Sequence, residues 1–464
     1  KKVYSMKEQK LSNRFCPEGM TVEEWQVGLR REFAEQNPFD VEHLDENRIW
    51  GDYLVANGRN RYRVAFRGVR SERNYCSCLD FRTNGLGTCK HIEAVTLFLQ
   101  DQVPGYPWGE FDYTPEYSSI YVSYKGGRSI KMRVGREETA RFEALRARFF
   151  DESGTLPPEN YSFLPQICDE AKDIAASFRC YEDVFDLTQE HCRRMEWQDY
   201  LRETNPDKRV DNEYTADMPE EMRRHVYDLA YEGHGVMVGL PSDVIVREVV
   251  ALADVYLRDQ PGATGYVIIN DPQRFILWRN AFANPALRRL PIEVMHASAF
   301  VKKVANNVPP CTFMFVEQAA RLKEWRDPVS VAIKRMQIDH LYMNLETIED
   351  LTPVQFSSVV QHIDPFILGP FYRFIRDYRP IFPLRNDGSN LPDDVRDFMF
   401  LYTSDSIREM NEMLPPIRTA EILLHGTDAE EEIDKLLRHL NRVLSNDTLR
   451  EVFLKRISMI VGAS

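Results

Sequence analysis

The alternation of apolar and polar residues indicates a mixed N-terminal part followed by an α/β part. Residues 21–24 have the spacing of a capping box, and the apolar residues after them recur at helical intervals, which predicts that residues 1 to about 45 are helical. Two runs typical of strands follow at residues 49–55 and 61–69. Asn57-Gly58 between them predicts a hairpin turn.

Further along, residues 119–124 and 129–134 alternate apolar and polar side chains around a Lys-Gly-Gly sequence, which predicts a second hairpin. Helical periodicity follows over residues 137–150 and much of 160–205. From about residue 220, short runs that are apolar on both faces alternate with helical segments. The apolar runs are Gly235–Val238, Tyr266–Ile269 and Phe313–Val316. Such strands argue for a parallel α/β sheet.

Length and composition narrow the class of protein. The chain has 464 residues, which is long enough for about three domains. Charged residues make up 28% and hydrophobic residues 43%, as in globular proteins. The sequence contains no run of about 18 apolar residues, so no membrane span is expected. No signal-type apolar segment follows Lys1, and a cytoplasmic protein is therefore expected.

Three cysteines and a histidine lie between the first hairpin and a helical segment. Cys76 and Cys78 end a β-type run, and Cys89 and His91 open an amphipathic helix. Three thiolates and an imidazole form the ligand set of a four-coordinate structural Zn²⁺. The spacing therefore predicts a zinc site, and the alternative is four buried residues that bind no metal. The other five of the eight cysteines are scattered, which favours buried thiols over a disulfide framework.

The pattern Cys-x-Cys-x(n)-Cys-x-His resembles the SWIM-type zinc finger. This resemblance implies binding to DNA or to protein partners and does not imply catalysis. Six arginines crowd the preceding hairpin: Arg59, Arg61, Arg63, Arg67, Arg70 and Arg73. The net charge of −13 argues against a uniformly basic surface, so any nucleic-acid site must be local. The arginines form either such a site or an ordinary solvated strand face.

The second half of the chain resembles the first ATPase lobe of the SNF2-family (Swi2/Snf2) DNA translocases. The segment Val359–Pro370 is similar to the family's Gln-x-Ile-Asp-Pro run and the Leu-Gly sequence after it. Aligned from this segment, residues 236–255 overlay the nucleotide-binding strand, loop and helix, and Val316–Trp325 overlay the acidic motif. The resemblance implies a RecA-like lobe of the P-loop NTPase type. A SWIM finger before such a lobe is typical of bacterial SNF2-related proteins.

The positions that perform ATP hydrolysis in this family carry other residues here. The Gly-Lys-Thr of the phosphate loop, which cradles phosphates and Mg²⁺, is replaced by Val244, Ile245 and Val246. At the acidic motif Glu317 still carries a carboxylate, but Gln318 stands where a water-activating Glu belongs, and an amide cannot accept that proton. We therefore predict a degenerate lobe that is not an enzyme, a pseudo-ATPase. A misaligned loop with a phosphate site elsewhere is the competing explanation.

These patterns predict that the chain has four segments. They are an N-terminal helix, hairpin and zinc finger (1–103), an α+β intermediate region (104–211), the degenerate lobe (212–385) and a helical brace-like C-terminal segment (386–464). The family's second lobe is absent from this sequence, which leaves open whether it was lost or lies beyond this chain.

We expect a catalytically inactive scaffold that binds zinc and, through its surface, double-stranded DNA, protein partners or both. One alternative is a subunit of an ATP-dependent DNA translocase that a partner chain completes. Another alternative is a pure protein-interaction subunit with no nucleic-acid role.

Overall fold

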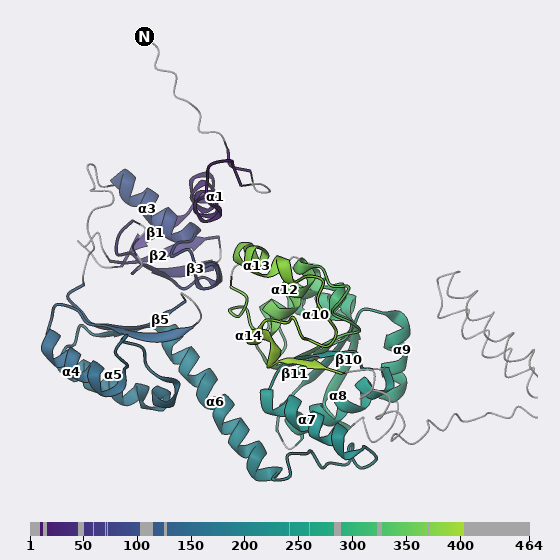
Figure 1. The fold of residues 1–464 in the computed structure, drawn as a ribbon. Coiled ribbons are helices and arrows are strands. Elements are labelled where there is room, and N and C mark those ends of the chain that lie inside the picture. Colours follow the sequence, from purple (N-terminus) through teal and green to yellow (C-terminus); the bar gives the residue numbers. More distant parts are fainter. Residues whose placement is uncertain are drawn as a thin grey trace, which may run out of the picture. The chain divides into compact units, whose positions relative to one another are not determined.

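The computed structural model describes residues 10–12, 16–44, 51–58, 60–69, 71, 73–102, 115–124, 128–240, 242–258, 260–282, 289–322, 327–369 and 371–402 (Figure 1). By packing, the chain divides into Lys1–Leu414 and Pro415–Ser464, and the second unit lies outside the described residues. Most of the predicted helical C-terminal segment therefore also lies outside them.

An antiparallel sheet forms the centre of the N-terminal module. Its strands, in spatial order, are β1 (Asp40–His43), β2 (Asp52–Asn57), β3 (Asn60–Ala65) and β4 (Tyr75–Cys76). The helices are α1 (Val22–Gln36), α2 (Leu79–Asn84) and α3 (Lys90–Gln102). Thr21 and Glu24 form the predicted capping box of α1, and Asn57 pairs with Asn60 at the predicted hairpin. The helical prediction is wrong at β1, because pairing with β2 decides the conformation there.

The intermediate region contains a three-stranded sheet of order β6-β5-β7, with strands β5 (Ser119–Ser123), β6 (Ser129–Arg133) and β7 (Arg179–Cys180). Its helices are α4 (Thr139–Phe149), the 3₁₀ helix η1 (Pro158–Phe163), α5 (Leu164–Ile174) and α6 (Glu182–Thr204). The second predicted hairpin, β5 with β6, is confirmed. Apolar residues of this sheet pack with those of α4, α5 and the start of α6 in one core.

A six-stranded, wholly parallel sheet follows, in the order β10-β9-β11-β12-β8-β13. The strands are β8 (Gly235–Val238), β9 (Gly265–Ile269), β10 (Ile292–His296), β11 (Cys311–Val316), β12 (Ile338–Leu345) and β13 (Met399–Leu401). The mixed α/β fold with this parallel sheet is consistent with a RecA-like lobe. The prediction of a helical C-terminal segment is wrong at Met399–Leu401, because three residues carry no periodicity that distinguishes a strand from a helix.

Helices cover both faces of the parallel sheet (Figure 1). Successive strand residues enter two different hydrophobic cores. One core contains α7 (Glu220–Glu232), α8 (Ser242–Leu257) and α9 (Pro272–Ala281). The other contains α10 (Ala297–Asn306), α11 (Pro328–Arg335), α12 (Pro353–Ile363) and α13 (Phe371–Tyr378). Short elements η3 (Ala319–Arg321), η4 (Arg379–Ile381) and α14 (Asp393–Arg396) complete this lobe. Both faces of the sheet are therefore buried, as the apolar strand sequences predicted.

Among the described residues, no helix combines the length and the apolar character that crossing a membrane would require.

Candidate functional site

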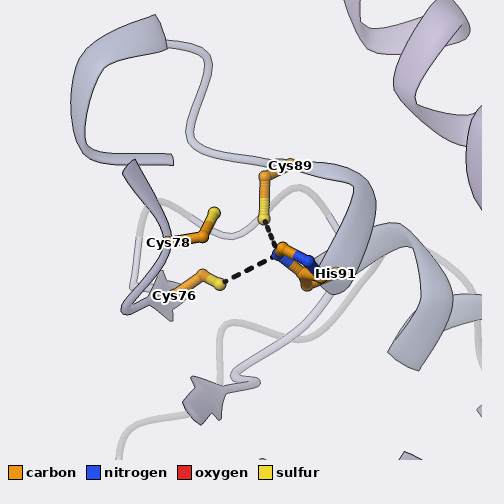
Figure 2. Close-up of side chains that lie close together, drawn as sticks. All are labelled: Cys76, Cys78, Cys89 and His91. Atoms are coloured by element: carbon orange, nitrogen blue, oxygen red, sulfur yellow. Dashed lines mark hydrogen bonds between the residues drawn. The ribbon is translucent and has the colours of Figure 1, made fainter. Parts of the chain in front are cut away.

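The predicted cysteine and histidine ligands come together at one end of the N-terminal sheet (Figure 2). Cys76 ends β4, and Cys78 is the N-cap of α2. Cys89 directly precedes α3, and His91 lies in its first turn. All four side chains are buried, and their ligand atoms lie within 4.8 Å of one another. The four predicted ligands therefore form one buried side-chain cluster.

The geometry of this cluster fits a tetrahedral metal. His91 directs Nδ1 toward the sulfurs, at 3.6 Å from Cys76 Sγ and 3.8 Å from Cys89 Sγ (Figure 2). Zn–S and Zn–N bonds of the usual lengths, about 2.3 and 2.0 Å, imply a sulfur–nitrogen separation of about 3.6 Å in a tetrahedron. The donor set and its spacing thus suit Zn²⁺, with Cys76, Cys78, Cys89 and His91 Nδ1 as the four ligands.

The three thiols differ in the direction of their pKa shifts. Burial raises the pKa of Cys76 and of Cys89, whereas hydrogen bonds from these two thiols lower the pKa of Cys78. The backbone N–H of Phe81, in the first turn of α2, donates to Cys78 Sγ at 3.3 Å and favours the thiolate further. A divalent cation at this position would stabilise all three thiolates, which burial alone disfavours.

The loop between the two ligand pairs is fixed by its own hydrogen bonds. Asn84 Nδ2 donates to the carbonyl oxygen of Thr88 at 2.8 Å, and Asn84 Oδ1 accepts from the N–H of Leu86 at 2.7 Å. Gly85 ends α2 in the left-handed conformation, at φ 61°, which glycine adopts at little cost. These contacts hold the second ligand pair near the first.

Packing orients the imidazole of His91. The ring of Tyr62 stacks on it with centroids 4.2 Å apart, and Phe39 approaches it edge-on at 5.7 Å. Nε2 of His91 is buried and has no hydrogen-bond partner among the described residues. The ring orientation therefore depends on the two aromatic contacts rather than on a hydrogen bond at Nε2, which a metal-bound histidine usually makes.

The arginines of the hairpin differ in their environments. Arg61 is exposed on β3, and no carboxylate pairs with it in the described part of the chain. Arg63 and Arg73 are partly buried, and Arg67 is only 2% exposed. Arg59 and Arg70 lie outside the described residues. The interpretation of the hairpin arginines as a nucleic-acid site stays a prediction, and within it the guanidinium of Arg67 is buried and ion-paired.

The carboxylate of Asp52 organises these arginines. It pairs with Arg63 at 2.6 Å, with Arg67 at 2.9 Å and with Arg179, at the start of β7, at 3.0 Å. Burial alone would raise the pKa of Asp52, but the hydrogen bonds and charges of its arginine neighbours lower it overall. Sequence reasoning missed Asp52 and Arg179, because no local pattern connects two residues so far apart in the chain.

The connection between β8 and α8 lies where the SNF2 resemblance places the phosphate loop. Only residues 239–241 separate the strand from the helix. The N–H of Gly239 donates to the carbonyl oxygen of Leu345 at 3.0 Å, which continues the pairing with β12. Val244 and Ile245, in the first turn of α8, are fully buried in the hydrophobic core that α8 shares with the sheet. Val246 is partly buried against the same core. The side chains at these three positions therefore pack in the hydrophobic core.

The carboxyl end of β11 carries a buried acidic group. Glu317 is fully buried, and its Oε1 lies 2.7 Å from Nη2 of Arg274 on α9. Trp278 Nε1–H donates to Glu317 Oε2 at 2.6 Å. Burial raises the pKa of Glu317, and the positive charge of Arg274 partly opposes this effect. No local sequence pattern connects Glu317 with Arg274 or Trp278.

Gln318, the next residue, adopts the left-handed conformation, with φ 54° and ψ 53°. Its backbone N–H donates to Asn344 Oδ1 at 2.7 Å, and its Nε2 donates to Glu346 Oε1 at 3.2 Å. A left-handed non-glycine residue costs free energy that the surrounding contacts must offset, and such residues cluster at functional sites. Polar side chains thus connect the carboxyl ends of the neighbouring strands β11 and β12.

Comparisons with known proteins find similarity in solved structures only. No family model matches the chain, and no curated protein matches it either. A Sulfolobus solfataricus SWI2/SNF2 ATPase core in complex with dsDNA is similar over 43% of this chain and 47% of its own, with 13% identity and a TM-score of 0.36. The S. solfataricus SWI2/SNF2 ATPase core domain is similar over 45% and 46%, with 10% identity and a TM-score of 0.35. The chain spans about half the length of each structure.

Proposed function

We propose that this chain is an SNF2-related, zinc-binding scaffold that binds double-stranded DNA, a protein partner or both without hydrolysing ATP. The ion pair between Arg274 and Glu317 is the observation on which the absence of hydrolysis chiefly rests. An acidic motif of an ATPase must leave its carboxylate oxygens accessible to Mg²⁺ and its bound water. Here one oxygen of Glu317 faces a guanidinium and the other accepts from an indole N–H.

The short β8–α8 connection supports the same proposal. A phosphate loop of the form Gly-x-x-x-x-Gly-Lys-Ser/Thr has four residues between its two glycines, and its backbone N–H groups surround the phosphates. Residues 239–241 alone connect the strand and the helix, and the Gly239 N–H is already bonded to Leu345. Val244 and Ile245 instead bury apolar surface, which stabilises the lobe by roughly 25 cal/mol per Å².

The zinc site gives the proposed scaffold a rigid N-terminal module. Ligands from β4, from the start of α2 and from the start of α3 would be joined by one metal ion. Because a structural zinc contributes its binding free energy to folding, the module would depend on the metal for its stability. Among the described hairpin arginines, Arg61, exposed on the adjacent strand, is the best placed for a phosphate contact.

The test combines three measurements on one preparation of the full chain. We expect bound zinc, binding to duplex DNA that weakens steeply with salt, and no ATP hydrolysis with or without DNA. DNA-stimulated hydrolysis would contradict the proposal and support a working translocase. Zinc binding without any DNA affinity would support the protein-interaction subunit instead.

A further inference from the structure

Two neighbouring arginines of α1 reach the two helices that begin at the proposed zinc ligands. Arg30 pairs with Asp80, in the first turn of α2. Arg31 pairs with Glu93, in the first turn of α3. Each of these acidic residues lies two positions after a proposed ligand. Helix α1 therefore connects the ligand-bearing ends of α2 and α3.

The pair of Arg30 with Asp80 has a fixed, two-point geometry. Arg30 Nη2 donates to Asp80 Oδ1 at 2.6 Å, and Nε donates to Oδ2 at 3.0 Å. Nη1 donates to the backbone and side-chain oxygens of Gln26, both at 3.0 Å. The two side chains are 17% and 35% exposed. Exposed ion pairs contribute little, but a partly buried two-point pair fixes direction as well as distance. It therefore orients the first turn of α2.

The contact between Arg31 and Glu93 is longer and belongs to a network. Arg31 Nη1 lies 3.7 Å from Glu93 Oε2, and Nη2 donates to Gln100 Oε1, further along α3, at 3.1 Å. Within α1, Arg31 also pairs with Glu35 at 3.2 Å. Glu93 Oε1 accepts from Thr88 Oγ1, directly before the third cysteine, at 2.7 Å. Glu93 thus connects α1 with the segment that carries the second ligand pair.

Aromatic contacts extend from α1 to the imidazole. The rings of Phe33, on α1, and Phe39 meet edge to face with centroids 6.3 Å apart, and Phe39 approaches His91 edge-on. Lys90 Nζ lies 4.8 Å from the centroid of the Phe33 ring. Ala34 of α1 is buried in the same core as all three cysteines. The helix therefore packs against the site as well as pairing with its surroundings.

These contacts bear on how firmly a metal would be held. Release of a tetrahedral metal requires its ligands to move apart, and the ligands here begin two different helices. Moving the first turns of α2 and α3 apart would also strain their pairs with α1. Removing a contact that orients metal ligands from outside the ligand set typically lowers metal affinity about 10–100-fold.

We propose that α1 positions the ligands of the zinc site and slows the release of the metal, with Arg30 and Arg31 as the positioning residues. Neither arginine would ligate the metal. This inference rests on the proposed zinc binding and adds to it a helix that precedes the ligand motif in the sequence.

Arg30→Gln tests this role, and Thr21→Ala is the matched control. Thr21 caps the N-terminus of α1, so its loss weakens the same helix and leaves both arginines in place. Competition between the full chain and a chelating zinc indicator gives the zinc affinity, and zinc transfer to excess indicator gives the release rate. Arg30→Gln should lower the affinity about tenfold, mostly through faster release. Thr21→Ala should stay close to the wild type in both quantities.

Further variants separate positioning from a general loss of stability. Asp80→Asn should weaken zinc binding as Arg30→Gln does, and the double variant should bind no more weakly than either, because both changes remove one pair. Arg30→Lys should recover part of the affinity, because ammonium keeps the charge without the planar fork. If Arg30→Gln does not fold, Arg30→Lys carries the comparison, with a smaller loss expected. Arg31→Gln should also weaken binding.

Three results would overturn the proposed role of α1. Wild-type affinities and release rates in folded Arg30→Gln and Arg31→Gln would do so while leaving the zinc site intact. An equal loss of affinity in Thr21→Ala would do the same, because the effect would then follow the stability of the helix. A folded wild-type chain that binds no zinc would overturn both this role and the zinc site itself.

Discussion

Arg274 on α9 pairs at 2.7 Å with Glu317, the fully buried carboxylate that follows β11. The pair joins a helix to the carboxyl end of a central strand in the parallel sheet. In an ATPase lobe this edge holds Mg²⁺ and the phosphates of the nucleotide. An internal guanidinium would supply positive charge here in place of a metal ion.

Removing this guanidinium should destabilise the lobe. Arg274→Gln leaves the Glu317 carboxylate buried without its ion-pair partner, which typically costs about 3–5 kcal/mol. The double variant Arg274→Gln, Glu317→Gln removes both charges and should recover part of that loss. Urea unfolding curves of the two variants and the wild type give the comparison. A single variant as stable as the wild type would show that the ion pair contributes nothing.

Zinc should be bound by the Cys76, Cys78, Cys89 and His91 cluster and lost when a ligand is removed. We expect about one zinc ion per chain in the wild type, by elemental analysis, and none in Cys76→Ser. Amide hydrogen exchange in α2 and α3 should become faster in that variant. Cys192→Ser, on α6, is the control and should retain the metal. Retention of zinc by Cys76→Ser would exclude this cluster as the site.

Of two arginines in the same hairpin, Arg67 should stabilise the fold and Arg61 should contribute to DNA binding. Arg67→Gln breaks a buried ion pair with Asp52 and should lower the free energy of unfolding by about 3 kcal/mol. Arg61→Gln changes an exposed residue and should leave the unfolding free energy within about 0.5 kcal/mol of the wild type. Arg61→Gln should instead weaken DNA binding at low salt. Thermal unfolding and DNA titration measure the two effects. Loss of stability in Arg61→Gln and loss of DNA binding alone in Arg67→Gln would contradict these two roles.

A buried carboxyl on α8 should make stability depend on pH. Glu248 is fully buried, accepts a hydrogen bond from Tyr402 Oη at 3.2 Å, and has its pKa raised by burial to about 8. The folded state therefore keeps the proton that the unfolded chain releases at lower pH. The resulting stabilisation is complete below the ordinary pKa of glutamate and is lost as the pH rises toward 8.

Glu248→Gln cannot ionise, so it should escape this loss. Its free energy of unfolding should rise relative to the wild type between about pH 5 and pH 8, by on the order of a few kcal/mol. Urea unfolding at a series of pH values measures the difference. Parallel pH profiles for the two proteins would mean that Glu248 ionises normally in the folded chain.

Sequence patterns predicted the parts of the fold whose signals are local. The capping box at Thr21, the two hairpins and the four clustered Cys and His residues are each encoded within a short segment. Strands β7 and β13 have two and three residues and carry no usable periodicity. The pairs of Asp52 with Arg179 and of Arg274 with Glu317 join distant segments, so only the folded chain reveals them.

Calorimetric titration of the full, zinc-loaded chain with Mg-ATP tests the central claim most directly. That claim is that residues 239–246 and Glu317 form a packed edge of the lobe and not a nucleotide site. We predict no heat of binding and no rise in the thermal unfolding temperature at saturating Mg-ATP, because a ligand that binds the folded state must stabilise it. Stoichiometric Mg-ATP binding that is lost in Glu317→Gln, with the variant still folded, would contradict the claim.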